Sequence, residues 1–250
     1  EPVVKAITEQ AQRGLTYMLS TEDVPEVGRL LAEMFGPPLW QVATTATDAN
    51  RFVIRWCRAI TRRPKVLVFN GCYHGAVDDT FLRLENGKQV NRAGLLGQVY
   101  DLTQGTVVIE FNDLDALHQA LAKGDVACIL AEPALTNIGM VLPQPGYLDG
   151  MQEIARKHGT LVIIDETHTI STGYGGYTRV HGLKPDFFTL GKPVAGVGNR
   201  VSCPHCGGNP VIAAGSASVT MLGVRVAVDG METSCGATLI GSAPAQTAEA

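Results

Sequence analysis

The sequence predicts an α/β domain with a mostly parallel sheet, followed by a small glycine-rich all-β segment. Two observations predict the domain: short apolar runs alternate with amphipathic helical patterns, and several of these runs are apolar throughout. Strands alternating with helices favour a parallel sheet buried on both faces. A third observation, the loss of helical patterns after about residue 196, predicts the second part. We therefore divide the chain into residues 1–196 and 197–250, the latter ending in a disordered tail.

The first two helices are predicted from apolar residues at helical spacing. One spans residues 24–34 and is stopped by Gly36 and two prolines; the other spans about 48–61 and is capped by Thr47 or Asp48. The apolar face expected for the second helix consists of Phe52, Val53, Trp56, Cys57 and Ile60.

Five strands are predicted from short runs rich in β-branched and aromatic residues. They are residues 65–69, 106–111, 126–132, 160–166 and 186–190. Two predicted helices lie between the three middle strands. One begins at Asp113, and the other spans residues 146–158. This alternation completes the prediction of a mostly parallel sheet.

The composition limits the classes of function. The chain has 250 residues, of which 45% are hydrophobic and 18% charged, as in ordinary globular proteins. Its net charge of −4 gives no reason to expect nucleic acid or an anionic membrane as a partner. No apolar run approaches the roughly 20 residues that span a bilayer, and the N-terminal residues lack a signal-peptide pattern. We therefore expect a cytoplasmic protein.

Three ionisable residues follow predicted strands. Glu132, Asp165 and Lys192 each lie at or just beyond the end of an apolar run. Ligands of open α/β sheets bind beyond the carboxyl ends of the strands, so these groups are expected along the ligand-binding edge.

These residue types suit the chemistry of pyridoxal phosphate. Asp165 could hold the protonated ring nitrogen of the cofactor, and Lys192 could form a Schiff base with it. The ring of Tyr73, next to His74 at another strand end, could stack on the planar cofactor. The helix that follows residues 44–47 offers free N–H groups to a phosphate.

Each residue also has a structural alternative. Asp165 and Glu166 could be a structural or solvated acid pair at a strand end, and Lys192 could be a surface lysine. Tyr73 could lie in the core or at its rim, and His74 could be hydrogen-bonded and not catalytic. Only their order and context favour the cofactor site.

Four stretches resemble the class III aminotransferases, the group that includes glutamate-1-semialdehyde aminomutase. They are TTATDAN, NGCYHGAVDDTF, the run from Ala131 to Thr169, and KPDFFTLGKPVAG. The resemblance covers about residues 1–196 and implies the large domain of a fold-type-I pyridoxal-phosphate-dependent transferase. It implies transfer of an amino group between a small-molecule donor and acceptor, or a mutase variant, in a homodimer.

The resemblance also implies the roles of individual residues. Lys192 would be the Schiff-base lysine and proton shuttle, Asp165 the partner of the ring nitrogen, and Tyr73 the stacking residue beside His74. The other residues implied at the cofactor are Ala46 and Thr47 at the phosphate, Glu132 and Asn137 nearby, and His168 on its flank.

Two departures from the family pattern stand out. The family has Ser-Gly-Thr at the phosphate turn, where this chain has Thr45-Ala46-Thr47. Family members also continue for well over a hundred residues beyond the lysine. We therefore expect an incomplete large domain, and the alternative to a catalytic chain is an inactive one.

The second part contains an internal repeat with an offset of 32 residues, as between Cys203 and Cys235. Residues 190–243 resemble the PAAR family of small β cones, which cap the spike of the type VI secretion system. The alternative function is therefore a structural module that docks on a secretion spike protein. Because Lys192 belongs to both resemblances, we place a join between Leu190 and Gly198, either natural or an artefact of sequence assembly.

The second part also holds a cluster of metal-ligating residue types. Cys203, His205, Cys206 and Cys235 could bind zinc, or the cysteines could be thiols on a small β module.

Overall fold

The computed structural model describes residues 2–14, 21–190, 220–221, 224–225 and 234–235. The chain divides into two compact units, residues 1–41 and 42–250. The first unit contains helices α1 (Pro2–Arg13) and α2 (Val24–Phe35). Helix α2 matches the helix predicted over residues 24–34. The division at residue 196 stays a prediction, because residues 191–219 lie outside the described parts.

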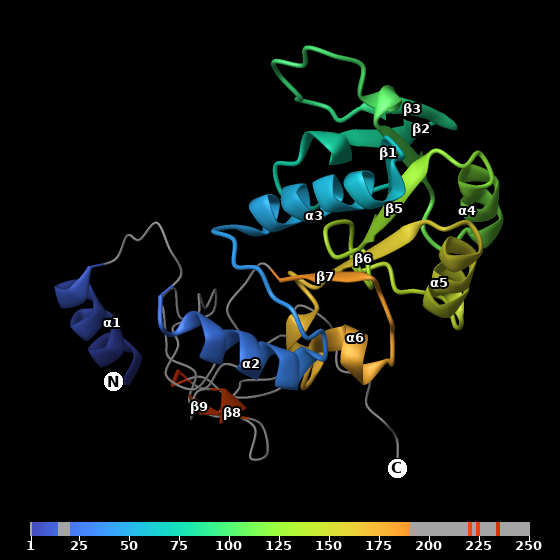
Figure 1. The fold of residues 1–250 in the computed structure, drawn as a ribbon. Helices are drawn as coiled ribbons and strands as arrows, with labels where there is room; N and C mark the ends of the chain where they lie inside the picture. Colours follow the sequence, from blue (N-terminus) through green and yellow to red (C-terminus); the bar gives the residue numbers. More distant parts are fainter. Residues whose placement is uncertain (1, 15–20, 191–219, 222–223, 226–233, 236–250) are drawn as a thin grey trace. The chain divides into compact units, whose positions relative to one another are not determined.

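A five-stranded parallel sheet forms the centre of the second unit (Figure 1). Its strand order is β4-β1-β5-β6-β7. The strands are β1 (Lys65–Phe69), β4 (Thr106–Ile109), β5 (Val126–Ala131), β6 (Leu161–Asp165) and β7 (Phe187–Thr189). All five were predicted, and every residue of β5 is buried, as an apolar run in a parallel sheet requires.

Helices cover both faces of this sheet (Figure 1). Helix α3 (Ala46–Thr61) lies on one face, and α4 (Leu114–Leu121) and α5 (Tyr147–Lys157) lie on the other. The Asp113 carboxylate caps α4 by accepting a hydrogen bond from the Ala116 N–H. The helices bury side chains that include Ile54 and Cys57 of α3, Leu117 and Leu121 of α4, and Met151 of α5.

The predicted start of α3 was wrong. The cap is Thr45, not Thr47 or Asp48, because the Thr45 backbone is extended (φ −139°, ψ 161°) and its hydroxyl accepts from the Asp48 N–H at 3.1 Å. Thr47 and Asp48 therefore lie inside the first turn of the helix.

The predicted apolar face of α3 was partly wrong. Phe52, Trp56 and Ile60 are exposed, with Trp56 at 65% of its maximum. The face toward the sheet consists of Asn50, Val53, Ile54 and Cys57. A polar residue occupies the buried face because hydrogen bonds satisfy its amide, as described below.

Several smaller elements connect the layers. A hairpin of β2 (Leu82–Glu85) and β3 (Lys88–Asn91) turns at Asn86 and Gly87, which both have positive φ, the usual chemistry of a tight hairpin turn. The others are η1 (Asp78–Thr80), η2 (Leu102–Gln104), η3 (Ile170–Thr172), α6 (Gly176–Val180), β8 (Thr220–Met221) and β9 (Val224–Arg225). Among the described residues, none of the helices has the length and apolar character needed to cross a bilayer.

Candidate active site

The carboxyl edge of the sheet brings Asp165, His74 and Glu132 together. Asp165 is the last residue of β6 and pairs in register with Thr189 of β7. Glu132 directly follows β5, the strand next to β6. All three side chains are buried, so their charges depend on their partners.

Four donor interactions surround the Asp165 carboxylate, which is 3% exposed. Its Oδ2 accepts from Asn50 Nδ2 and lies against His74 Nδ1, both at 2.8 Å. Its Oδ1 accepts from the Thr167 N–H at 3.0 Å and the Thr167 hydroxyl at 2.6 Å. Burial alone would raise the pKa of Asp165, but the contact with His74 and these hydrogen bonds lower it to about 2. Asp165 is therefore ionised at neutral pH.

The His74 imidazole contacts the Asp165 carboxylate and is buried. Burial alone would lower the pKa of His74, but Cys72 and the Asp165 carboxylate raise it to about 10. The imidazole therefore stays protonated and forms an ion pair with Asp165. Of the two roles considered for His74, hydrogen-bonded or catalytic, the hydrogen-bonded role fits this position. His74 would therefore act on a cofactor through Asp165.

Tyr73 differs from its neighbour, because its side chain is half-exposed at the same edge. Its backbone N–H donates to Glu132 Oε1 at 3.2 Å, which ties the loop after β1 to the end of β5. The guanidinium of Arg92 lies 5.9 Å from the centre of the Tyr73 ring. The ring is thus held in place and remains accessible to a planar ligand.

A second polar cluster surrounds Glu132. Its Oε2 accepts from the Thr136 hydroxyl at 2.7 Å, and the same hydroxyl lies 2.5 Å from His168 Nδ1. Burial opposes ionisation of Glu132, but His168, His74 and Thr136 lower its pKa overall. Asn137 is exposed, and its amide reaches Thr136 at 3.4 Å. Glu132, Asn137 and His168 therefore lie on one connected wall.

The start of α3 offers a seat for an anion. Ala46 and Thr47 lie in its first turn, where N–H groups have no partners within a helix. The Thr47 hydroxyl accepts from the Ala76 N–H at 3.1 Å, so the helix start is fixed to the loop that carries Tyr73 and His74.

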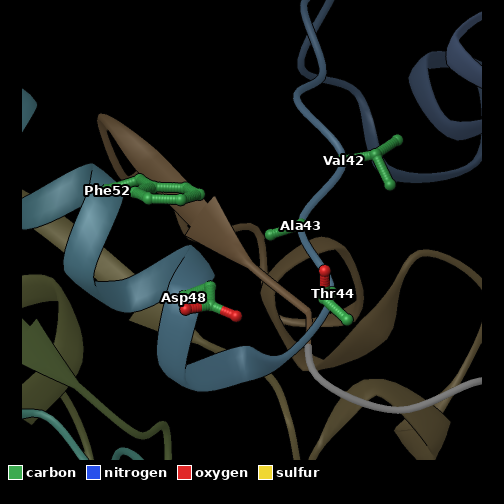
Figure 2. A pocket seen from close by; sticks show the side chains of 5 residues that line it. All are labelled: Val42, Ala43, Thr44, Asp48 and Phe52. Carbon is green, nitrogen blue, oxygen red and sulfur yellow. The ribbon is translucent and has the colours of Figure 1, made fainter. Parts of the chain in front are cut away.

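A cavity of about 250 Å³ lies beside this helix start, between residues 42–44 and α3 (Figure 2). It is lined by Val42, Ala43, Thr44, Asp48 and Phe52. Asp48 is the ionisable group of this lining, and its carboxylate would repel a phosphate. Asp48 also lies in the first turn of α3, so the candidate phosphate seat consists of the N–H groups of Ala46 and Thr47 and not of this cavity.

Replacing Gly75 with alanine is expected to destabilise the chain by at least about 2 kcal/mol. Gly75 has a φ of +82°, and an added Cβ would lie 2.2 Å from the Thr47 hydroxyl. Gly87→Ala is a matched control, because Gly87 has a φ of +74° and open space around it. Urea unfolding of both variants measures the difference; equal losses would show that the close contact with Thr47 is unimportant.

Sequence reasoning missed three contributors to the site: Asn50, Thr136 and Thr167. The signal for Asn50 was a polar residue at a position that shares a helical face with Val53 and Cys57. Thr136 and Thr167 carried no comparable signal, because threonines are common in loops.

Some predicted site residues lie outside the described parts of the chain: Lys192, Cys203, His205 and Cys206. Cys235 is described and is exposed. In the described ranges, no three histidine, cysteine or acidic side chains form a group that could hold a metal ion. The zinc site and the β cone therefore stay predictions.

The fold, an α/β domain with a mostly parallel sheet, is that of the fold-type-I pyridoxal-phosphate-dependent transferases. Residues 1–218 match the family described as aminotransferase class-III. The chain belongs to this family. The match extends past the proposed join near residues 190–198 and into the segment predicted to be PAAR-like.

Several similar curated proteins are aminomutases. A glutamate-1-semialdehyde 2,1-aminomutase of Roseiflexus castenholzii is 39% identical over 201 residues, which are 78% of this chain and 46% of the relative. A counterpart from Brevibacillus brevis is 35% identical over a similar share. The chain thus spans about half the length of the curated relatives it matches.

Solved structures agree with this assignment. A glutamate-1-semialdehyde aminomutase of Pseudomonas aeruginosa PAO1 is 53% identical, with a TM-score of 0.75 over 77% of this chain and 43% of that one. A lysine-to-alanine variant of an aminomutase from the same strain, in complex with PMP, gives a TM-score of 0.73 at 53% identity, over 75% of this chain and 42% of that one. An omega-transaminase of Sphaerobacter thermophilus gives a TM-score of 0.68 at 29% identity, over 76% of this chain and 46% of that one.

Proposed function

We propose that this chain carries the cofactor-binding part of a pyridoxal-phosphate-dependent aminotransferase or aminomutase. Its substrates would be a small-molecule amino donor and acceptor. The observation that supports this most directly is the ionised, buried Asp165 at the carboxyl edge of the sheet, with its pKa lowered to about 2. A carboxylate that stays charged in such a place suits a protonated ring nitrogen.

The other described residues fit the same cofactor. When bound, pyridoxal phosphate supplies an electron sink for the carbon from which a proton is removed. Asp165 would keep the ring nitrogen protonated, and the exposed ring of Tyr73 would stack on the cofactor. The N–H groups of Ala46 and Thr47 would bind the phosphate. Glu132, with Asn137 and His168, would form the adjoining wall of the site.

Lys192 would be the covalent attachment point and the proton carrier. It follows Thr189, the last residue of β7, by three positions, and Thr189 pairs with Asp165 in the sheet. The amine Nζ would bind the aldehyde carbon of the cofactor, and once released it would remove and return the proton of the substrate.

We also propose that the enzyme acts as a homodimer. The exposed face of α3, formed by Phe52, Trp56 and Ile60, supports this proposal, because a run of apolar side chains along one helix favours burial against another protein surface. Light scattering of the parent and of Trp56→Ser would compare their oligomeric states.

Replacing Lys192 with alanine is expected to abolish covalent attachment of pyridoxal phosphate. The parent protein should develop a visible absorption band with the cofactor, and borohydride should fix the cofactor mass on the peptide that contains Lys192. Lys184→Ala is the matched control, because Lys184 is an exposed lysine eight residues earlier in the chain. Equal spectra for all three proteins would refute the proposal for this chain. A labelled parent would then be screened with amino donors.

A further inference from the structure

Asn50 joins three parts of the site through one side chain. Its Nδ2 donates to Asp165 Oδ2 at 2.8 Å and to the His74 carbonyl at 3.1 Å. Its Oδ1 accepts from the Thr189 hydroxyl at 2.9 Å. The side chain is completely buried, so water cannot replace any of these partners. One amide therefore links α3, the loop after β1, and the ends of β6 and β7.

Only an amide meets these demands at this size. Two of the partners are acceptors, the Asp165 carboxylate and the His74 carbonyl, and the third is the hydroxyl donor of Thr189. An aspartate at position 50 could accept from Thr189 but would turn an acceptor toward Asp165. A leucine would fill the space and satisfy none of the three.

Asn50 links the ends of β6 and β7, and a pyridoxal-phosphate site must fix the position of these two strand ends relative to each other. Asp165 ends β6, and Thr189 ends β7 three residues before Lys192. The Glu166 N–H also donates to the Thr189 carbonyl at 2.9 Å, so the backbone and the Asn50 amide hold the same strand end. A shift of β7 would move Thr189, from which the chain continues to Lys192.

We propose that Asn50 is a positioning residue, whose amide locks the Asp165 carboxylate to the end of β7, the strand that precedes Lys192 in the sequence. This inference rests on the proposed function for its catalytic meaning. The linkage of Asp165 and Thr189 through Asn50 is testable without the cofactor.

The first test measures the cofactor site in Asn50→Asp and Asn50→Ala. We expect the midpoint of the pH titration of the bound cofactor's absorbance to shift in both variants, because Asn50→Ala releases the Asp165 carboxylate and Asn50→Asp places a second acid beside it. We also expect at least about tenfold slower borohydride fixation on Lys192, the factor lost with one charged hydrogen bond. Asn91→Ala, at an exposed asparagine that ends β3, should match the parent.

The second test is a double-mutant cycle on the urea unfolding equilibrium, using Asn50→Ala, Thr189→Val and the double variant of the cofactor-free chain. If the amide and hydroxyl act together, the two changes combined should alter the unfolding constant about fivefold less than the product of their separate effects. Independent effects, or an unchanged titration midpoint in Asn50→Asp, would overturn the inference. A parent that takes up no cofactor would instead refute the proposed function, and the cycle would still decide whether Asn50 couples the strand ends.

Discussion

Asp165→Ala is expected to lower the free energy of unfolding by about 3–5 kcal/mol and to abolish tight cofactor binding. The substitution leaves the His74 cation and the Asn50 amide facing a buried space without an acceptor. A buried charge without its partner costs more than the ion pair contributes, which is why the loss is large. Urea unfolding and cofactor titration measure the two effects. Asp115→Ala, at an exposed acid on α4, serves as the control.

The same ion pair gives the stability of the parent a defined pH dependence. The pKa of His74 is raised from 6.5 to about 10, so its contribution is complete below pH 6.5 and is lost as the pH rises toward 10. The pKa of Asp165 is lowered from 3.8 to about 2, so its contribution is present above 3.8 and is lost as the pH falls through 2. Asp165→Ala should remove the part of the alkaline loss that comes from Asp165 and leave the part that comes from Cys72, the first cause of the raised pKa of His74. Parallel profiles for parent and variant above pH 6.5 would contradict this account of the pair.

Glu166→Ala is expected to cost about 3 kcal/mol or more, although Glu166 is not assigned to the cofactor. Its buried carboxylate accepts from the Thr169 hydroxyl at 2.6 Å and from the backbone N–H groups of Tyr177 and Thr178 at 3.1 and 2.5 Å. Alanine would leave these donors without an acceptor. The carboxylate therefore holds the chain from η3 to α6 against the end of β6.

Glu166→Gln separates charge from hydrogen bonding at this position. Glutamine keeps one acceptor oxygen but turns an NH₂ group toward donors, so we expect an intermediate loss of stability. Urea unfolding and limited proteolysis between residues 169 and 178 measure both variants. A glutamine variant as unstable as the alanine variant would show that one remaining acceptor does not hold this segment.

The sheet could be predicted from the sequence because its three inner strands, β1, β5 and β6, are buried on both faces. An apolar run such as 126–131 leaves little choice of environment, and the helices between the runs require parallel connections. The strand ends then located Asp165 and Glu132 without further information. The consecutive residues Asn86 and Gly87 are a turn signal for the hairpin, and the prediction did not use this signal.

Helix α3 shows what the sequence could not provide. A periodicity argument buries the largest apolar side chains, and it placed Trp56 on the inner face. The structure buries Asn50 instead, because its partners Asp165 and Thr189 come from strands 115 and 139 residues later in the chain. No local pattern reports such partners. For the same reason, His74 could be placed near the site but not recognised as the counter-charge of Asp165.

These separations also bear on the order of folding. The contacts of Asn50 with Asp165 and Thr189, and of His74 with Asp165, join segments that are 115, 139 and 91 residues apart. Closing loops of this length costs entropy before any contact forms, so non-local contacts favour late steps. Substitutions in this network should therefore accelerate unfolding more than they slow folding. The polar edge that would hold the cofactor is completed only once β7 has joined the sheet.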